Sequence, residues 1–303
     1  MAINTLDQLY AAISAGQTYK TSVCKQLASS PAYTAGRWYC MNQLPGNPPA
    51  EAYATMSAST SYIMNSGLAG WMPTGGTAGA VGPTYTKYLV GMEAVTNASA
   101  GLPIWIMLCD MLFVYPSIPL TAATVTLINN VTLQRYTTGA GVQMFLELFT
   151  STSNYGYTGT LAVNYNNSAG SPVAHNTSGT INCAAQASAQ APVVLHSGTA
   201  AGNYAPFLPL ASGDSGITLG NTVTIGTGAA TTVGNLILCK PLATIPVTQQ
   251  YYPSSRDFVF NMPNMPVIQD DNTHGAYLGF LVYVGGALAV STDINVTLDF
   301  VWG

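Results

Sequence analysis

The spacing of apolar residues near the start of the chain predicts a short amphipathic helix. Four apolar residues share one helical face there: Leu6, Leu9, Tyr10 and Ile13. Thr5 is suited to cap this helix and Gly16 to end it, because Thr accepts from free backbone N–H groups and Gly adopts the left-handed conformation. The same reasoning predicts a second helix over 18–28 and a third over 123–133.

From Gly141 onward, short β-branched and aromatic segments alternate with stretches of Gly, Asn, Ser and Pro, which is typical of an all-β region. Eight strands are predicted, over 142–151, 160–166, 179–185, 192–197, 217–226, 235–240, 276–284 and 294–302. In the last of them every second residue is apolar, so one face is buried and the C-terminus forms an integral strand. The fold class expected is mainly β, a jelly-roll-like β-sandwich with a short N-terminal helical and extended region.

We therefore expect residues 1–100 to form the N-terminal helix, an extended arm and loops, and residues 101–303 to form the β-sandwich domain. The most apolar window, 102–120, contains Asp110 and three prolines, so it is too interrupted for a membrane helix and is interpreted as core. Two stretches rich in Gly, Ala, Ser and Thr, 74–84 and 184–205, are interpreted as loops.

Charged residues make up only 6% of the 303 residues, against about 25% in an average soluble domain. Hydrophobic residues make up 48%, which supplies a large core and excludes the intrinsically disordered class. The seven basic residues are scattered singly, so no positive stripe is available to neutralise phosphates. We expect neither a nucleic-acid partner nor a membrane partner.

The start of the chain and the cysteines both favour an intracellular origin. The first fifteen residues lack the basic region and the uninterrupted apolar stretch of a signal peptide, so we expect a protein that is not exported. The five cysteines lie far apart, without the paired short spacing of zinc or redox sites. Buried free thiols in a reducing compartment are expected.

Several motifs invite a chemical interpretation, and each has a plainer one. "GDSG" at 213–216 resembles a protease serine loop centred on Ser215, yet the following residues and the histidine contexts do not match, and a tight turn explains it better. "QDDNTHG" at 269–275 offers either a solvated turn or a weak surface calcium or subunit-contact site. The Gly-rich stretches 74–82 and 226–235 lack the features of phosphate loops.

The acidic residues give no sign of paired catalytic carboxylates. Those considered are Glu51, Glu93, Asp110 and Glu147, which stand alone in dissimilar settings. Such acids more often bind backbone donors or pair with an arginine such as Arg135. We therefore expect a protein that is not an enzyme and that has no catalytic residue, cofactor or metal site.

The uncharged composition favours assembly, because covering a neutral surface costs little ion desolvation. The Pro-rich arm over 37–53 holds the predicted interaction residues, which are Arg37, Trp38, Tyr39, Pro48, Pro49 and Tyr53. Two interpretations of this arm stay open. It either lies across a neighbouring subunit or packs along its own domain.

Several segments carry a family resemblance. They are "TLDQLYAAISAG", "TAGRWYCMNQLPGNPPA", "VTLQRYTTGAGVQMFLELFTSTS", "FLPLASGDSGITLGNTVTIGTG", "LILCKPLATIPV", "LGFLVYVGGA" and "LDFVWG". Across nearly the whole chain the sequence resembles virion structural proteins of tailed bacteriophages. The resemblance implies a non-enzymatic particle component, made in the bacterial host cytoplasm and located in the virion.

The leading hypothesis is a capsid decoration or cement protein whose partners are the major capsid protein and other virion proteins. We expect a homo-oligomer, with a trimer by analogy with the three-fold positions of capsids. The alternatives are a tail, neck or head-fibre protein with receptor-binding or glycan-binding loops, a jelly-roll major capsid protein, and a hydrolase that uses Ser215.

Overall fold

A computed structural model describes most of the chain. The described residues are 3–27, 33, 35–51, 53–75, 86–121, 123–149, 158–169, 175–182, 193–195, 206–226, 233–269, 275–289 and 291–303. Within them the protein is mainly β, and its antiparallel strands form three sheets. None of the helices in the described ranges is both long enough and apolar enough to cross a membrane.

The central sheet closes on itself. Its strands, in spatial order, are β13 (Val233–Val247), β8 (Gln143–Phe149), β11 (Val193–Leu195), β2 (Arg37–Cys40), β16 (Leu278–Val284), β6 (Ile104–Pro119) and β4 (Tyr62–Ile63). Because β13 also pairs with β6 along almost its whole length, the strands from β13 to β6 form a closed antiparallel ring. We call this ring the barrel. Closure removes the open edges that such a sheet would otherwise expose.

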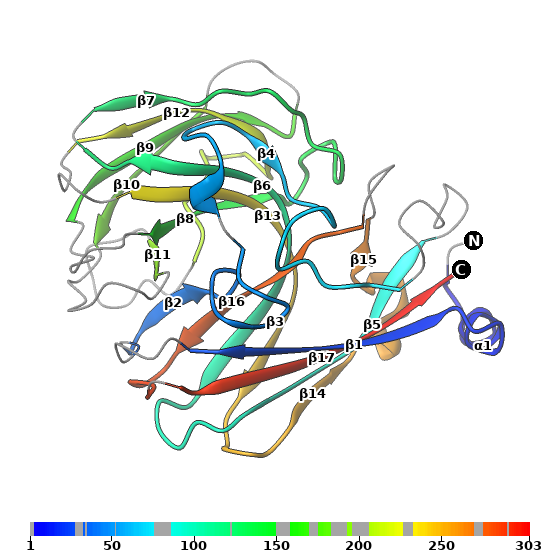
Figure 1. The fold of residues 1–303 in the computed structure, drawn as a ribbon. Helices are drawn as coiled ribbons and strands as arrows, with labels where there is room; N and C mark the ends of the chain where they lie inside the picture. Colours follow the sequence, from blue (N-terminus) through cyan, green and yellow to red (C-terminus); the bar gives the residue numbers. More distant parts are fainter. Residues whose placement is uncertain are drawn as a thin grey trace.

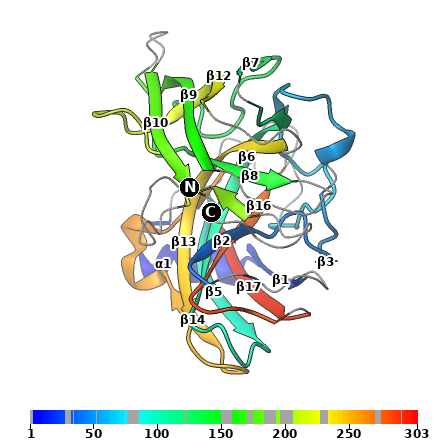
Figure 2. The same cartoon turned by 90° about the vertical axis from the view of Figure 1, so that its left-hand side faces the viewer.

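Two further sheets flank the barrel on opposite sides (Figure 1). The lower sheet consists of β14 (Ser254–Asp257), β5 (Lys87–Thr96), β17 (Asp293–Trp302), β1 (Thr18–Gln26) and β3 (Gly46–Asn47), with β15 (Val267–Ile268) paired to β5. The upper sheet consists of β10 (His175–Asn182), β9 (Thr158–Asn167), β12 (Ile217–Ile225) and β7 (Thr124–Thr126). The perpendicular view shows the long β13 running from the upper region into the lower one (Figure 2).

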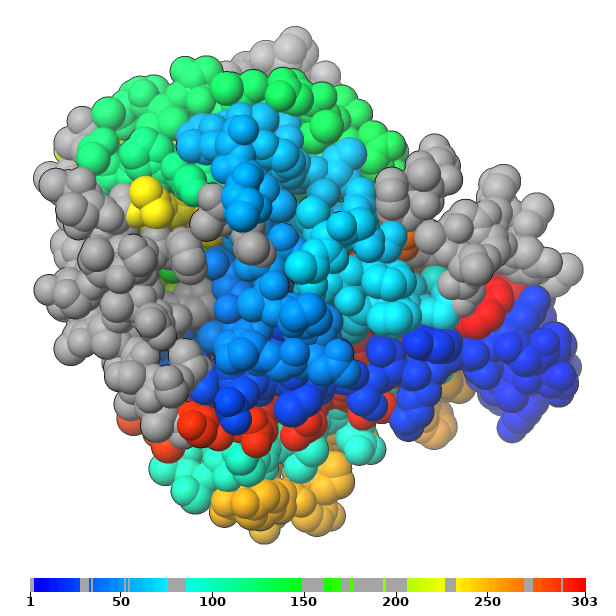
Figure 3. Space-filling model, in the orientation of Figure 1, coloured from blue at the N-terminus to red at the C-terminus, as the bar shows by residue number. Residues whose placement is uncertain are grey.

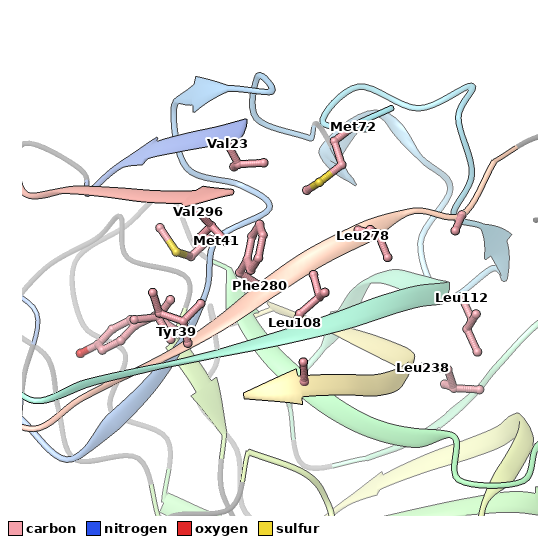
Figure 4. Packing of buried hydrophobic residues seen from close by; sticks show 14 of the residues in the cluster. Val23, Tyr39, Met41, Met72, Leu108, Leu112, Leu238, Leu278, Phe280 and Val296 are labelled. Carbon is pink, nitrogen blue, oxygen red and sulfur yellow. The ribbon is translucent and has the colours of Figure 1, made fainter. Parts of the chain in front are cut away.

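The apolar side chains form two clusters, one on each face of the barrel wall. The interior cluster includes Trp38, Cys40, Cys109, Met111, Phe145, Val194, Ile237, Cys239 and Leu281. The second cluster fills the space between the barrel and the flanking sheets, where Val23 and Val296 face Leu108 and Phe280 (Figure 4). Strands covered on both faces need apolar residues at nearly every position, and this explains the continuous apolar run of β6.

The predicted class is confirmed, with the addition that the central layer closes into a barrel. The first helix is also confirmed as α1 (Leu6–Ser14), where Thr5 and Gln8 form a capping box and Gly16 has φ +72°. All eight predicted strands are present, although β10 begins at His175, ahead of its predicted start, and β13 continues to Val247, past its predicted end.

Two predicted helices are wrong. Residues 18–26 form β1, which pairs with β17 from Thr18 opposite Val301 to Gln26 opposite Asp293. The segment 123–133 holds the short strand β7 followed by irregular structure. In both segments pairing with a distant strand outweighs local helical spacing, as tertiary context often does. Most of the two predicted loops, 74–84 and 184–205, lies outside the described residues.

The division at residue 100 does not separate two units among the described residues. Strands β1, β3 and β5, from the range 1–100, pair with β14 and β17, from the range 101–303, in one sheet. Strand β2 from the first range is part of the barrel. The two ranges are therefore interleaved.

Candidate functional site

The predicted interaction arm packs along its own chain. Trp38 lies inside the barrel against Tyr283, and Tyr39 contacts Tyr33 with ring centroids 4.4 Å apart. Tyr53, in the short helix η1 (Tyr53–Thr55), is buried as well. Since burial in the chain's own core uses the surfaces that a partner would touch, the structure favours the second of the two interpretations of this arm.

The remaining arm residues are held by local contacts. Buried Lys25 donates from Nζ to the backbone oxygens of Pro48 at 2.7 Å and Pro49 at 3.4 Å. Burial lowers the pKa of Lys25 to about 8. Arg37 begins β2 and is half-buried. The contacts of Lys25 fasten the arm to β1.

The "GDSG" segment is a turn before β12. Gly213 has φ +91° and the Asp214 N–H donates to the Ala211 carbonyl oxygen. The Asp214 carboxylate accepts from Tyr165 Oη at 2.6 Å and from Asn167 Nδ2 at 2.8 Å. These two donors, together with His175 Nδ1 at 3.0 Å, hold the pKa of Asp214 below its usual range.

Within the described residues, which include His175 but not His196 or His274, no histidine links Ser215 to that network. Ser215 Oγ lies 3.0 Å from Ser168 Oγ. A serine nucleophile needs an imidazole between itself and the aspartate, whereas His175 contacts Asp214 and not the serine. The geometry is that of a hydrogen-bonded turn, as the sequence indicates.

The barrel interior holds a group of buried polar side chains. Glu147 is fully buried, and Gln43 donates to its Oε1. Burial raises the pKa of Glu147 to about 8, although hydrogen bonds with Cys40 and Gln43 oppose this. Its Oε2 has no hydrogen-bond partner within the described ranges. A neutral carboxyl group suits this enclosed position.

Burial also keeps two of the barrel thiols in the protonated form. Cys40, Cys109 and Cys239 are free and buried, as predicted, whereas Cys24 is free but only half-buried, so the predicted burial is wrong for it. Burial raises the pKa of Cys40 and of Cys239, so both stay protonated and poorly nucleophilic. No group of three His, Cys, Asp or Glu side chains suited to a metal ion is found in the described part of the chain. The polar loop 270–274 and Cys183 lie outside it.

A buried ion pair holds one loop against the barrel wall. Arg135 binds Asp110 through both Nε at 3.0 Å and Nη2 at 2.8 Å. The same Nη2 donates to the carbonyl oxygens of Met64 and Met111, each at 2.8 Å. The expected pairing of a buried acid with Arg135 is therefore confirmed for Asp110. These hydrogen bonds tie the segment around Arg135 to β6 and to the backbone at Met64.

The outer face of the lower sheet carries a concentration of exposed apolar groups. In α1 only Leu9 and Ala12 are buried, while Leu6, Tyr10 and Ile13 are exposed. Space-filling atoms show α1, in dark blue, projecting at the edge of the molecule (Figure 3). Beside it lies the 3-10 helix η2 (Val259–Asn264), drawn as an orange coil in Figures 1 and 2. Its Phe260 side chain is 94% exposed.

Between these elements lies a pocket of about 390 Å³. Its lining is mostly apolar, with Leu9, Ile13, Tyr19, Val90, Val259, Phe300 and Val301. Lys20 and Asp299 also line it, and their side chains form an exposed ion pair of 3.4 Å. We call Leu6, Tyr10, Ile13, Phe260 and this pocket the α1–η2 face. Exposed apolar patches of this kind mark interaction sites.

The sequence predicts the helix but not the α1–η2 face. Helical spacing places Leu6, Tyr10 and Ile13 on one face with Leu9, and only Leu9 of these four is buried. Phe260 follows two other apolar residues in "DFVFNMPN", so no periodic signal separates it from core residues. The one available signal is the length of α1, since a nine-residue helix with four large apolar side chains offers more apolar surface than one sheet contact covers.

The fold and the α1–η2 face thus define a mainly β protein with a filled barrel and an exposed apolar surface. No protein-family model matches the chain, and no curated protein matches it either. Among solved structures, one similar chain belongs to the structure of infectious bursal disease virus, Gx strain. It is 8% identical, the alignment covers 93% of this chain and 80% of that one, and the TM-score is 0.19. A likeness this weak supports no conclusion about fold or function.

Proposed function

We propose that this chain is a non-enzymatic structural protein that acts by binding other protein subunits, and that it decorates or cements a phage capsid. The observation that carries the contact role is the α1–η2 face, where exposed apolar side chains lie on the two helices that border an apolar pocket. The resemblance to virion proteins of tailed phages supports the proposal that the protein belongs to a phage particle. These are separate supports, and each is open to a separate test.

The composition of the surface fits a contact role. With 7 basic and 11 acidic residues in 303, there are few ions to desolvate when another subunit covers the exterior. Aromatic residues are enriched at the centres of protein interfaces, and Tyr10, Tyr19 and Phe260 are exposed around or beside the pocket. An interface on this face would bury apolar area without leaving an unpaired charge buried.

Three acids that a catalytic role could use are engaged in contacts within the described residues. Glu147 is enclosed in the barrel, Asp110 is paired with Arg135, and Asp214 accepts hydrogen bonds from Tyr165 and Asn167 and lies 3.0 Å from His175 Nδ1. Each of these acids has a structural task within the described residues. The proposal therefore needs no chemical step.

Particles purified from the source of this chain test the proposed function. Quantitative mass spectrometry gives the number of copies per particle, and immunogold labelling gives their position. Label spread over the shell, at a copy number below that of the main shell protein, is the expected result. Label confined to tails, necks or fibres would contradict the decoration or cement role and favour the receptor-binding or glycan-binding alternative.

Two other outcomes of the same experiment would contradict the proposed decoration or cement role. If this chain is the dominant protein of the shell, it is the major capsid protein instead. If it is absent from purified particles, the virion role is wrong.

A further inference from the structure

We propose that the α1–η2 face binds a second copy of this chain, with Phe260 of each copy entering the α1–η2 pocket of the other. This inference names the first partner of the contact surface and rests on the proposed contact role.

Phe260 is held outward by its neighbours. Phe258 and Met262, two residues away on either side, are buried and anchor the segment. Asp257 Oδ1 accepts from the Val259 N–H at 2.7 Å, and the Arg256 guanidinium lies 5.0 Å from the centre of the Phe258 ring. The backbone that carries this 94% exposed ring is anchored in this way, so binding orders the rotamers of the ring and not the segment itself.

The pocket suits an aromatic ring. Its volume of about 390 Å³ lies at the lower end of the range of about 300–1,000 Å³ for ligand pockets. Val90, Phe300 and Val301 line it from the sheet, and Leu9 and Ile13 from α1. Val259, the residue before Phe260, lines it from η2. The segment that carries the exposed ring therefore borders the pocket, because Phe260 directly follows a residue that lines it.

That adjacency favours a second copy as the occupant. In a two-fold interface the same patch serves both subunits, so a projection and a pocket side by side can each be filled by the other copy. The α1 stripe has matching symmetry, because Leu6 and Ile13 lie about one turn on either side of Tyr10. In an antiparallel pair of α1 helices, Leu6 of one copy meets Ile13 of the other.

Charge and area agree with this pairing. Asp7 is the sole charged residue of α1, and the Lys20–Asp299 pair at the pocket is neutral overall. Two copies therefore meet with little repulsion. Burying an aromatic side chain covers about 150–250 Å², so Phe260 and Tyr10 at 94% and 63% exposure supply about 300 Å² per copy. Leu6, Ile13 and the pocket walls extend this toward about 500 Å² per copy, the least that a biological interface buries.

Sedimentation equilibrium of the purified full chain, over a wide concentration range, tests the inference. We expect a dimer for the wild type. Phe260→Ser removes the projecting ring, and Thr18→Phe fills the pocket from within, because Thr18 lines it. Each variant alone should weaken dimerisation about 30-fold or more, as loss of an interface anchor does. Tyr252→Ser, which removes another exposed aromatic ring outside the face, is the matched control and should leave dimerisation unchanged.

Mixing the two variants gives the sharpest result. A heterodimer of the Phe260→Ser and Thr18→Phe chains keeps one intact contact, with the remaining Phe260 in the remaining open pocket. The mixture should therefore associate more tightly than either variant alone. Circular dichroism and thermal unfolding establish that each variant is folded.

The contrary outcomes are distinct from those of the particle experiment. A wild-type chain that stays monomeric, forms trimers, or dimerises equally well as Phe260→Ser would overturn the pairing, even if the chain is found on particles. A dimer that behaves as expected but is absent from particles would leave the pairing intact and remove the virion role.

Discussion

The barrel interior and the α1–η2 face differ in whether their unfavourably placed side chains have partners within the chain. Inside the barrel, Glu147 hydrogen-bonds with Cys40 and Gln43, and the surrounding apolar side chains exclude water. On the α1–η2 face, Tyr10 and Phe260 are exposed beside an apolar pocket. The first region is complete within one chain, and we propose that a second copy completes the other.

This difference separates stability from association. Substitutions in or against the barrel should lower the free energy of unfolding and leave the contact surface unchanged. Substitutions on the α1–η2 face should leave the unfolding of the separated chain almost unchanged and alter its association. We expect the largest loss of stability at the buried ion pair and the smallest at an exposed turn.

Replacing Arg135 by Met should destabilise the protein by about 3–5 kcal/mol, since it leaves Asp110 as an uncompensated buried charge. Urea unfolding measures the effect. The control is Arg256→Met, because Arg256 is exposed and such a change should cost under about 1 kcal/mol. Equal effects of the two variants would contradict the structural role of the buried pair.

Glu147→Gln should remove a pH dependence of stability. The pKa of Glu147 is raised from 4.5 to about 8 in the folded protein, so between these values the folded state holds a proton that the unfolded state has lost. Stability should therefore fall as pH rises through this window, by up to about 1.4 kcal/mol per pH unit. Denaturant unfolding at pH 5 and pH 8 measures the fall in the wild type.

In the Glu147→Gln variant the same pair of measurements should show a smaller fall. The exposed Glu93 provides the control, because Glu93→Gln should leave the wild-type pH dependence in place. An unchanged fall in Glu147→Gln would assign the pH dependence to other groups.

Phe260→Ser should change the free energy of unfolding by less than about 0.5 kcal/mol when measured at concentrations where the chain is monomeric, because the ring is 94% exposed. At high concentration the same variant should unfold at a lower temperature than the wild type, which gains stability from association. A large loss in the monomer would show that Phe260 supports the fold of its own chain and would count against its role as a contact residue.

Ser215→Ala should have the smallest effect of all. The substitution removes one hydrogen bond, between Ser168 Oγ and Ser215 Oγ, at an exposed turn. The free energy of unfolding should therefore change by under about 0.5 kcal/mol. Hydrolysis of a general ester substrate should be the same with wild type and variant. Activity that is lost in the variant would restore the hydrolase alternative.

The sequence predicts strands best where one face of a strand is polar. In β17 strict alternation from Ile294 onward indicates the strand directly, because its outer residues face solvent or polar neighbours. In β6 both faces are covered, so alternation disappears and the apolar run indicates core without indicating a strand. The fold class can be predicted from strands with one polar face, such as β17. Barrel closure depends on strands that are covered on both faces, such as β6, and these are not recognisable as strands in the sequence.

The wrong helix prediction over β1 has a specific cause. "TYKTSVCKQ" contains a period of two, since Val23 and Lys25 point inward and Ser22 and Cys24 are more exposed. Lys25 disguises this period, because a lysine looks like a surface residue in the sequence, whereas its ammonium group is buried and binds the carbonyl oxygens of Leu44 and Pro48. The α1–η2 face escapes prediction for a related reason, since the exposure of Phe260 is set by the tertiary position of η2.

A cryo-EM map of the assembled protein on its particle, at a resolution that places side chains, would show whether another copy covers the α1–η2 face. We expect α1 and Phe260 to lie at a boundary between protein subunits, with each Phe260 ring in the α1–η2 pocket of another copy. A map in which α1 and η2 face solvent, and subunits meet through the upper sheet instead, would contradict the proposed pairing.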